Sequence, residues 1–128
     1  MSRAVLDASA ILAFLRDEPG ADTVAGYRGD AMASAVNVAE AGARLADLGA
    51  SVAEVRRSID LMVLDVVPFD GDQAYDAAGI RDATRKRGLS LGDRACLQLA
   101  ARRGLPALTA DREWTEIDLD VDVRLIRQ

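Results

Sequence analysis

Four carboxylate residues of this 128-residue chain are candidates for catalysis or metal binding. Asp7 lies inside the apolar run AVLDASAIL, and an ionised carboxylate buried there costs several kcal/mol unless it is paired, capped or bound to a metal. Glu40 follows the segment AMASAVNVA, Asp93 lies in SLGDRACLQLA, and Asp111 directly follows PALTA. The sequence therefore predicts that something compensates the charge of Asp7.

The chain has no histidine, and this absence limits the chemistry that the carboxylates can share. Catalysis by Ser-His-Asp or Cys-His groups, zincin-type sites and any histidine general base are excluded. The only cysteine, Cys96, cannot form a disulfide within the chain. A catalytic metal would be held by oxygen atoms alone, which favours Mg²⁺ or Mn²⁺ over zinc or copper.

Composition and length bound the class of protein. The net charge of −5 and the isoelectric point of about 4.7 do not indicate nucleic-acid binding by charge alone. All basic residues except Lys86 are arginines, which read phosphates in bidentate fashion, although an Arg- and Ala-rich chain can also reflect genomic base composition. The length predicts one domain. Without a cationic leader or a long apolar stretch, we expect a soluble, cytoplasmic protein that does not contact membranes.

Apolar, β-prone stretches alternate with helical patterns along the chain, which predicts an α/β fold with a central, mainly parallel sheet and right-handed crossovers. A helical hairpin is expected where Gly49 ends one helix and Ser51 caps the next. The expected strands cover residues 3–6, 31–35, 65–69, 106–110 and 122–126, and the expected helices cover residues 8–20, 21–27, 36–50, 51–62, 70–88 and 90–104.

This topology predicts where the acids meet. Ligands of open α/β sheets gather at the carboxyl ends of the strands. Asp7 ends the first strand, and Asp111 directly follows the strand PALT. Glu40 lies in the first turns of the helix after AMAS, and Asp93 opens the helix after Leu89, so we expect all four acids at a single edge. The alternating acids Asp118, Asp120 and Asp122 instead fit the solvent face of a terminal strand.

Each of the four acids also has a purely structural interpretation. Asp7 could cap the helix that begins at Ala8, and Asp93 could close a capping box with Ser90. Glu40 could pair with Arg44, and Asp111 could be a turn residue. Taken together, four carboxylates at one edge repel each other, which favours a bound cation.

The segments VLDASAIL, SAVNVAE, LSLGDRACLQLA and LTADREW resemble, in order and spacing, the four acidic motifs of PIN-domain ribonucleases, most closely the VapC-type toxins of bacterial toxin-antitoxin pairs. The resemblance spans the whole chain and implies a single PIN domain over residues 1–128. It implies that Asp7, Glu40, Asp93 and Asp111 are the metal-binding catalytic acids. By the same resemblance, the supporting polar residues are Ser9, Asn37 and Thr109.

The resemblance further implies an endoribonuclease that uses Mg²⁺ or Mn²⁺ to hydrolyse phosphodiester bonds of single-stranded or loop RNA. The implied partners are a cognate VapB-like antitoxin and a second copy of the toxin in a homodimer. For the antitoxin groove, the expected segments are Ile11 to Leu15 and Leu45 to Leu61. Residues that could contact the RNA backbone are Arg94, Arg81, Arg85, Lys86 and Arg87.

Three competing interpretations each require particular residues. A haloacid-dehalogenase-type phosphotransferase would need an aspartate where Ser9 stands. A receiver domain would need an acidic pair at the end of the first strand and a late lysine, but Leu6 precedes Asp7 and Lys86 is the only lysine. A PIN-fold metal-binding module that contacts RNA or protein without nuclease activity remains an alternative.

Overall fold

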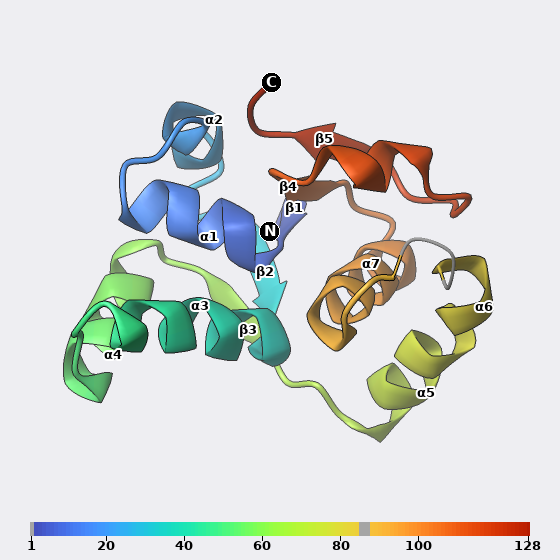
Figure 1. Cartoon of the computed structure of the whole chain (residues 1–128), viewed down its shortest axis with the longest axis horizontal. Coiled ribbons are helices and arrows are strands. Elements are labelled where there is room, and N and C mark those ends of the chain that lie inside the picture. Colours follow the sequence, from blue (N-terminus) through green and yellow to red (C-terminus); the bar gives the residue numbers. More distant parts are fainter. Residues whose placement is uncertain (1, 85–87) are drawn as a thin grey trace.

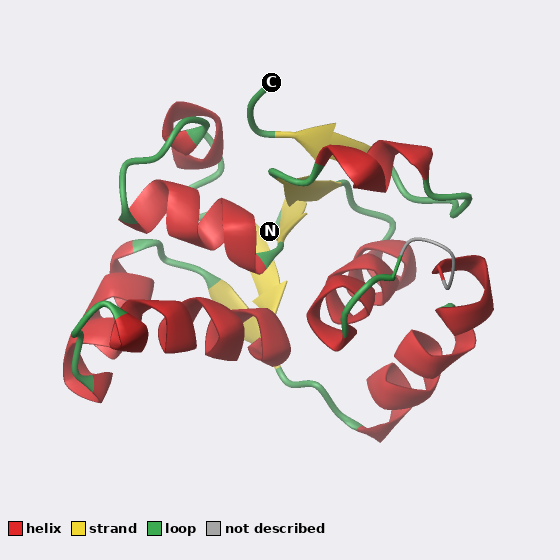
Figure 2. Cartoon of the chain, viewed as in Figure 1, coloured by secondary structure: helices red, strands yellow, loops and turns green. Residues whose placement is uncertain are grey.

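The computed structural model describes residues 2–84 and 88–128 and shows a parallel sheet between two groups of helices. Helices α1 to α4 lie on one side of the sheet and α5 to α7 on the other (Figure 1). The strands run through the middle of the molecule (Figure 2). In chain order the elements are β1 (Ala4–Leu6), α1 (Ala8–Leu15), α2 (Ala21–Ala25), β2 (Ala31–Ser34), α3 (Ala35–Asp47), α4 (Val52–Leu61), β3 (Asp65–Val67), α5 (Gly71–Gly79), α6 (Arg81–Thr84), α7 (Leu91–Arg103), β4 (Ala107–Thr109), a 3₁₀ helix (Arg112–Glu116) and β5 (Val123–Leu125).

The five strands pair in the order β3-β2-β1-β4-β5, and every pairing is parallel. The predicted α/β class with a mainly parallel sheet is therefore confirmed. Since β1 is central, Val5 pairs with Met32 on one side and with Ala107 on the other. The carboxyl ends of β1, β2 and β4 consequently lie side by side, and the helices or loops that carry the acids leave from that edge.

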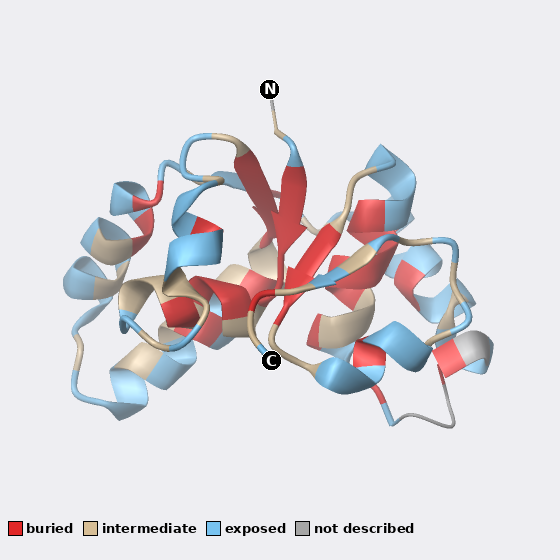
Figure 3. Ribbon diagram, turned by 90° about the horizontal axis from the view of Figure 1, so that it is seen from above, coloured by how far each residue is buried: buried red, intermediate tan, exposed pale blue. Residues whose placement is uncertain are grey.

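Side chains of β1 alternate between two hydrophobic cores, one on each face of the sheet. Leu6 packs into the core formed with α1 to α4, whereas Val5 packs into the core formed with α7. The residues of the three inner strands β1, β2 and β4 are buried, whereas the edge strands β3 and β5 are partly exposed (Figure 3). This double covering explains the continuous apolar runs that the strands show in the sequence.

The caps inferred from the sequence are present. Ser51 and Glu54 form a capping box at the start of α4, and Ser90 and Asp93 form another at the start of α7. Asp7 caps α1 by accepting a hydrogen bond from the Ala10 N–H. Each of these contacts spans three residues, which is why local sequence is sufficient to predict them.

Residues 70–88 do not form the single helix that the sequence pattern predicts. The first helix, α5, ends at Gly79, where Ile80 leaves helical geometry, and a short helix, α6, follows. Glycine weakens a helix at this point, and the Thr84 hydroxyl donates to the Ile80 carbonyl at 2.9 Å. The predicted basic residues 85–87 lie outside the described residues.

The predicted terminal strand also begins later than expected. Strand β5 starts at Val123, and residues 117–122 form no strand. The Val121 N–H donates to the Leu119 carbonyl two residues earlier, a tight turn that uses a donor which a sheet ladder would need. Asp118, Asp120 and Asp122 are nevertheless exposed, as the alternating pattern predicted.

Candidate functional site

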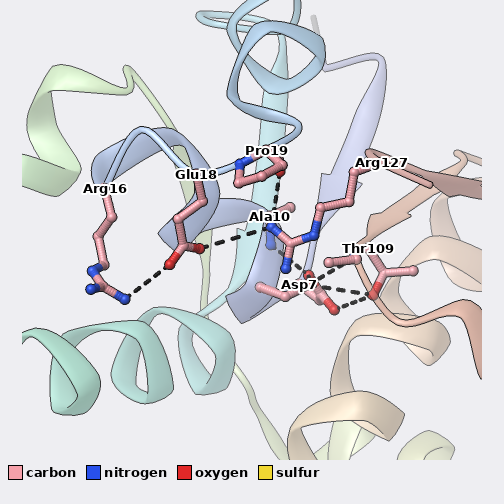
Figure 4. Close-up of polar contacts among 9 residues, drawn as sticks. Asp7, Ala10, Arg16, Glu18, Pro19, Thr109 and Arg127 are labelled. Carbon is pink, nitrogen blue, oxygen red and sulfur yellow. Dashed lines mark hydrogen bonds and ion pairs between the residues drawn. The ribbon is translucent and has the colours of Figure 1, made fainter.

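Asp7 lies at the junction of β1 and α1, with only 5% of its surface exposed. Its Oδ1 atom accepts hydrogen bonds from the Ser9 hydroxyl at 2.6 Å and from the Ala10 N–H at 2.8 Å. Its Oδ2 atom accepts from the Thr109 hydroxyl at 2.5 Å. Figure 4 shows the carboxylate between Ala10 of α1 and Thr109 of β4. Asp7 is thus held by groups from two adjacent strand ends.

Burial dominates the protonation of Asp7. It raises the pKa of this carboxyl from 3.8 to about 6, although the hydrogen bonds from Ser9, Thr109 and Ala10 act in the opposite direction. The negative charge of Asp93 raises the pKa further. The three hydrogen bonds therefore do not offset the free-energy cost of the buried charge. A cation beside Asp7 would offset that cost.

Ser9 and Thr109 connect Asp7 to the chain that carries Asp111. The Ser9 hydroxyl accepts from the Ala110 N–H at 2.9 Å, and the Thr109 hydroxyl accepts from the Asp111 N–H at 3.0 Å. The Asp111 carboxylate itself accepts from the Glu113 N–H and caps the 3₁₀ helix. Asp111 is therefore linked to Asp7 through its backbone, while its carboxylate is used locally.

Asn37 links Glu40 to the first turn of α7. This asparagine is 1% exposed, and its amide nitrogen donates to the Glu40 carboxylate at 3.1 Å and to the Gly92 carbonyl at 2.9 Å. Partial burial raises the pKa of Glu40, the hydrogen bond from Asn37 lowers it, and the charge of Asp93 raises it. Glu40 therefore shares an electrostatic environment with the acid of α7.

The negative charge of Asp93 raises the pKa of both Asp7 and Glu40. Its carboxylate accepts from the Ser90 N–H at 3.1 Å, and the Asp93 N–H donates to the Ser90 hydroxyl. Burial raises the pKa of the Cys96 thiol, on the same helix, well above its ordinary value, and the charges of Asp7, Asp93 and Glu40 add to this. Cys96 therefore stays a thiol surrounded by negative potential rather than a thiolate metal ligand.

The structure brings the acids to one edge but does not assemble the four-carboxylate cluster that the sequence predicts. In the part of the chain that is described, no three Asp, Glu or Cys side chains form a group that could hold a metal ion. Like-charged carboxylates repel each other, and each of the four accepts hydrogen bonds from donors in its own surroundings. These donors belong to Ser9, Ala10 and Thr109 for Asp7, Asn37 for Glu40, Ser90 for Asp93, and Glu113 for Asp111.

Two of the basic residues selected from the sequence can be placed. Arg94 is half-buried on α7 and donates to the Ala77 carbonyl of α5 at 3.2 Å, so at least part of its guanidinium joins two helices. Arg81 is exposed at the start of α6. Arg85, Lys86 and Arg87 lie outside the described residues. Sequence reasoning missed Gly92, whose only local signal is a glycine inside the first turn of a helix, next to Asp93.

The sequence profile of the PIN domain family matches residues 4–119, so this chain belongs to that family. No curated protein sequence matches the chain. Within the described residues, no helix is both long and apolar enough to cross a membrane.

The solved structures of similar fold include toxin-antitoxin proteins. The chain is similar to a DNA-bound VapBC from Salmonella typhimurium, with a TM-score of 0.72, 18% identity and coverage of 98% of this chain and 99% of the other. It is similar to FitAcB from Neisseria gonorrhoeae, with a TM-score of 0.68, 25% identity and coverage of 94% and 95%. It is also similar to Mycobacterium tuberculosis VapC20, a toxin that cleaves the sarcin-ricin loop. The TM-score is 0.73, the identity is 15%, and the match covers 88% of this chain and 93% of the other.

Proposed function

We propose that this protein is a metal-dependent endoribonuclease and the toxin of a VapBC-type toxin-antitoxin pair. The observation that carries the proposal is the carboxylate of Asp7, buried at the carboxyl end of the central strand and within electrostatic reach of Asp93. Membership of the PIN domain family and the fold shared with VapC20 support a nuclease. A buried acid with an unfavourable charge at a strand end is a position that a cation would stabilise.

The oxygen atoms of the four acids are the donor type that a hard divalent cation prefers. We assign Asp7, Glu40, Asp93 and Asp111 as its ligands, which supply only oxygen atoms and therefore suit Mg²⁺ or Mn²⁺. The chain has no histidine, and Cys96 is a buried thiol, so softer metals lack their usual ligands. When bound, the metal would lower the pKa of a water and stabilise charge on the oxygens of the scissile phosphodiester.

The polar residues around the acids hold them in place. Ser9 and Thr109 orient both oxygens of Asp7, and Thr109 also fixes the backbone of Asp111. Asn37 orients Glu40 from a fully buried position, and its own Oδ1 atom is buried without a hydrogen-bond partner in the described chain. We therefore assign all three as supporting residues.

The partners we propose follow from the same family relation. A VapB-like antitoxin is supported by the solved VapBC and FitAcB structures of similar fold. Of the two expected antitoxin segments, Leu45 to Leu61 carries exposed apolar side chains, with Val52 88% exposed and Leu48 and Leu61 more than half exposed. No residue of the segment Ile11 to Leu15 is exposed, because Ile11 and Ala13 pack into the core. We further propose RNA as the substrate, a homodimer as the assembly, and exposed Arg81 as an RNA contact.

The test is cleavage of a structured RNA by purified protein with Mn²⁺, with Mg²⁺ and with excess EDTA. We expect cleavage with either metal and none in EDTA. An Asp93→Asn preparation is the control for contaminating nuclease. Cleavage that persists undiminished in EDTA would contradict the metal mechanism. Mn²⁺ binding without cleavage of any RNA tested would favour the non-enzymatic module.

A further inference from the structure

The backbone conformation at position 92 does not require a glycine. Gly92 lies in the first turn of α7, is buried, and has no positive φ. A glycine in a helix is less favourable than alanine by about 1 kcal/mol. The reason for glycine at this position must therefore lie in what surrounds it.

The group that surrounds Gly92 is the carboxylate of Glu40. A Cβ atom built on Gly92 would overlap both carboxylate oxygens of Glu40 and the carbon between them, at separations that real Cβ atoms do not show. Asn37 holds this arrangement because one amide nitrogen donates both to Glu40 and to the Gly92 carbonyl. The carboxylate thus occupies the space that a side chain at position 92 would fill.

We propose that Gly92 is a positioning residue that sets the location of the Glu40 carboxylate against the first turn of α7, next to Asp93. The inference rests on the proposed function, because it assigns Glu40 to the metal site. Asp93 follows Gly92 directly and raises the pKa of Glu40, which places the two acids within electrostatic reach. Any side chain at position 92 forces the Glu40 carboxylate away from Asn37 and from α7.

The expected cost of a side chain is lost position rather than lost stability. Glu40 is exposed, and its carboxylate is the end of a flexible side chain that can rotate into solvent. Alanine is also the better helix former. Gly92→Ala should therefore fold at least as well as the wild type while the Glu40 carboxylate moves.

The experiment is a double-mutant cycle with Gly92→Ala and Glu40→Asp, read by Mn²⁺ binding in calorimetry and by RNA cleavage. We expect Gly92→Ala to lower Mn²⁺ affinity and cleavage at least tenfold when Glu40 is present. In the Glu40→Asp background, where the side chain is one methylene shorter, the same change should cost less than twofold. The matched control is Gly79→Ala, a helical glycine with open space around it.

A crystal structure of Gly92→Ala reads the inference independently of metal and RNA. We expect the hydrogen bond between Asn37 and Glu40 to be lost. A Glu40 carboxylate that stays on Asn37, or Mn²⁺ affinity equal to that of the wild type, would overturn the inference and leave the proposed function intact. A wild type that neither binds Mn²⁺ nor cleaves RNA would instead reject the proposed function, and the crystal structure would still decide the role of Gly92.

Discussion

Replacing Asp7 by asparagine should stabilise the metal-free protein at neutral pH. The pKa of this carboxyl is about 6 in the folded chain and 3.8 ordinarily, chiefly because of burial. At about 1.4 kcal/mol for each pKa unit, keeping Asp7 ionised costs about 3 kcal/mol. Asparagine carries no charge, keeps the size, and can still accept the Ala10 N–H. We expect a net gain of about 1 to 3 kcal/mol, because the new amide meets the Thr109 hydroxyl less favourably.

The pH dependence follows from the direction of the pKa change. Since the folded-state pKa is raised, the folded protein binds the proton more tightly than the unfolded chain does. The contribution of Asp7 to stability is therefore fully present below about pH 4 and is lost as pH rises through about 6. The advantage of Asp7→Asn should be absent near pH 4 and reach its full value above pH 7.

The assay is urea unfolding of wild type and Asp7→Asn from pH 4 to 8, with EDTA and with Mn²⁺. Exposed Asp120→Asn is the control and should follow the wild type at every pH. With Mn²⁺ at a hundred times its dissociation constant, only proteins that retain Asp7 should gain about 2.7 kcal/mol. An Asp7→Asn protein less stable than the wild type in EDTA, by an amount that does not vary with pH, would refute the reasoning.

Three further predictions use other parts of the molecule. In Asp93→Asn the new side chain can still accept the Ser90 N–H, so we expect thermal denaturation without metal to show a change in stability of at most about 1 kcal/mol. Mn²⁺ affinity and RNA cleavage should fall together, and retained cleavage would contradict a catalytic role. Gly20→Ala should destabilise the protein in urea more than Gly29→Ala does. Both glycines have positive φ, but only a Cβ at Gly20 would meet Ile126, at 2.8 Å, so equal effects would contradict this reasoning. The chain end beside Gly20 is also held by Arg127, which contacts Pro19 and Glu18 (Figure 4). Production of this chain alone should arrest growth of a bacterial host, Asp93→Asn should not, and normal growth with abundant folded wild type would argue against a toxin.

Sequence reasoning was most successful where contacts are local. The capping roles of Asp7, Ser51 and Ser90 depend on donors three residues away, so the local sequence indicates each of them. It failed at Ile80, where the helical pattern continues but the helix ends, and before Val123, where a tight turn replaces the expected strand. In both places a local conformational preference overrode the periodicity of apolar residues.

By itself, the sequence determined the alternation of strands and helices and the positions along the chain of four candidate acids, whose oxygen atoms suit a hard cation. Those properties depend on residue type and short-range spacing. Only the tertiary structure decided that the hydroxyl of Thr109 donates a hydrogen bond to Asp7, 102 positions away. It likewise decided that Gly92, 55 positions from Asn37, leaves the space that the Glu40 carboxylate occupies. The reason is that such contacts depend on strand order and register, which bring together groups that the chain keeps far apart.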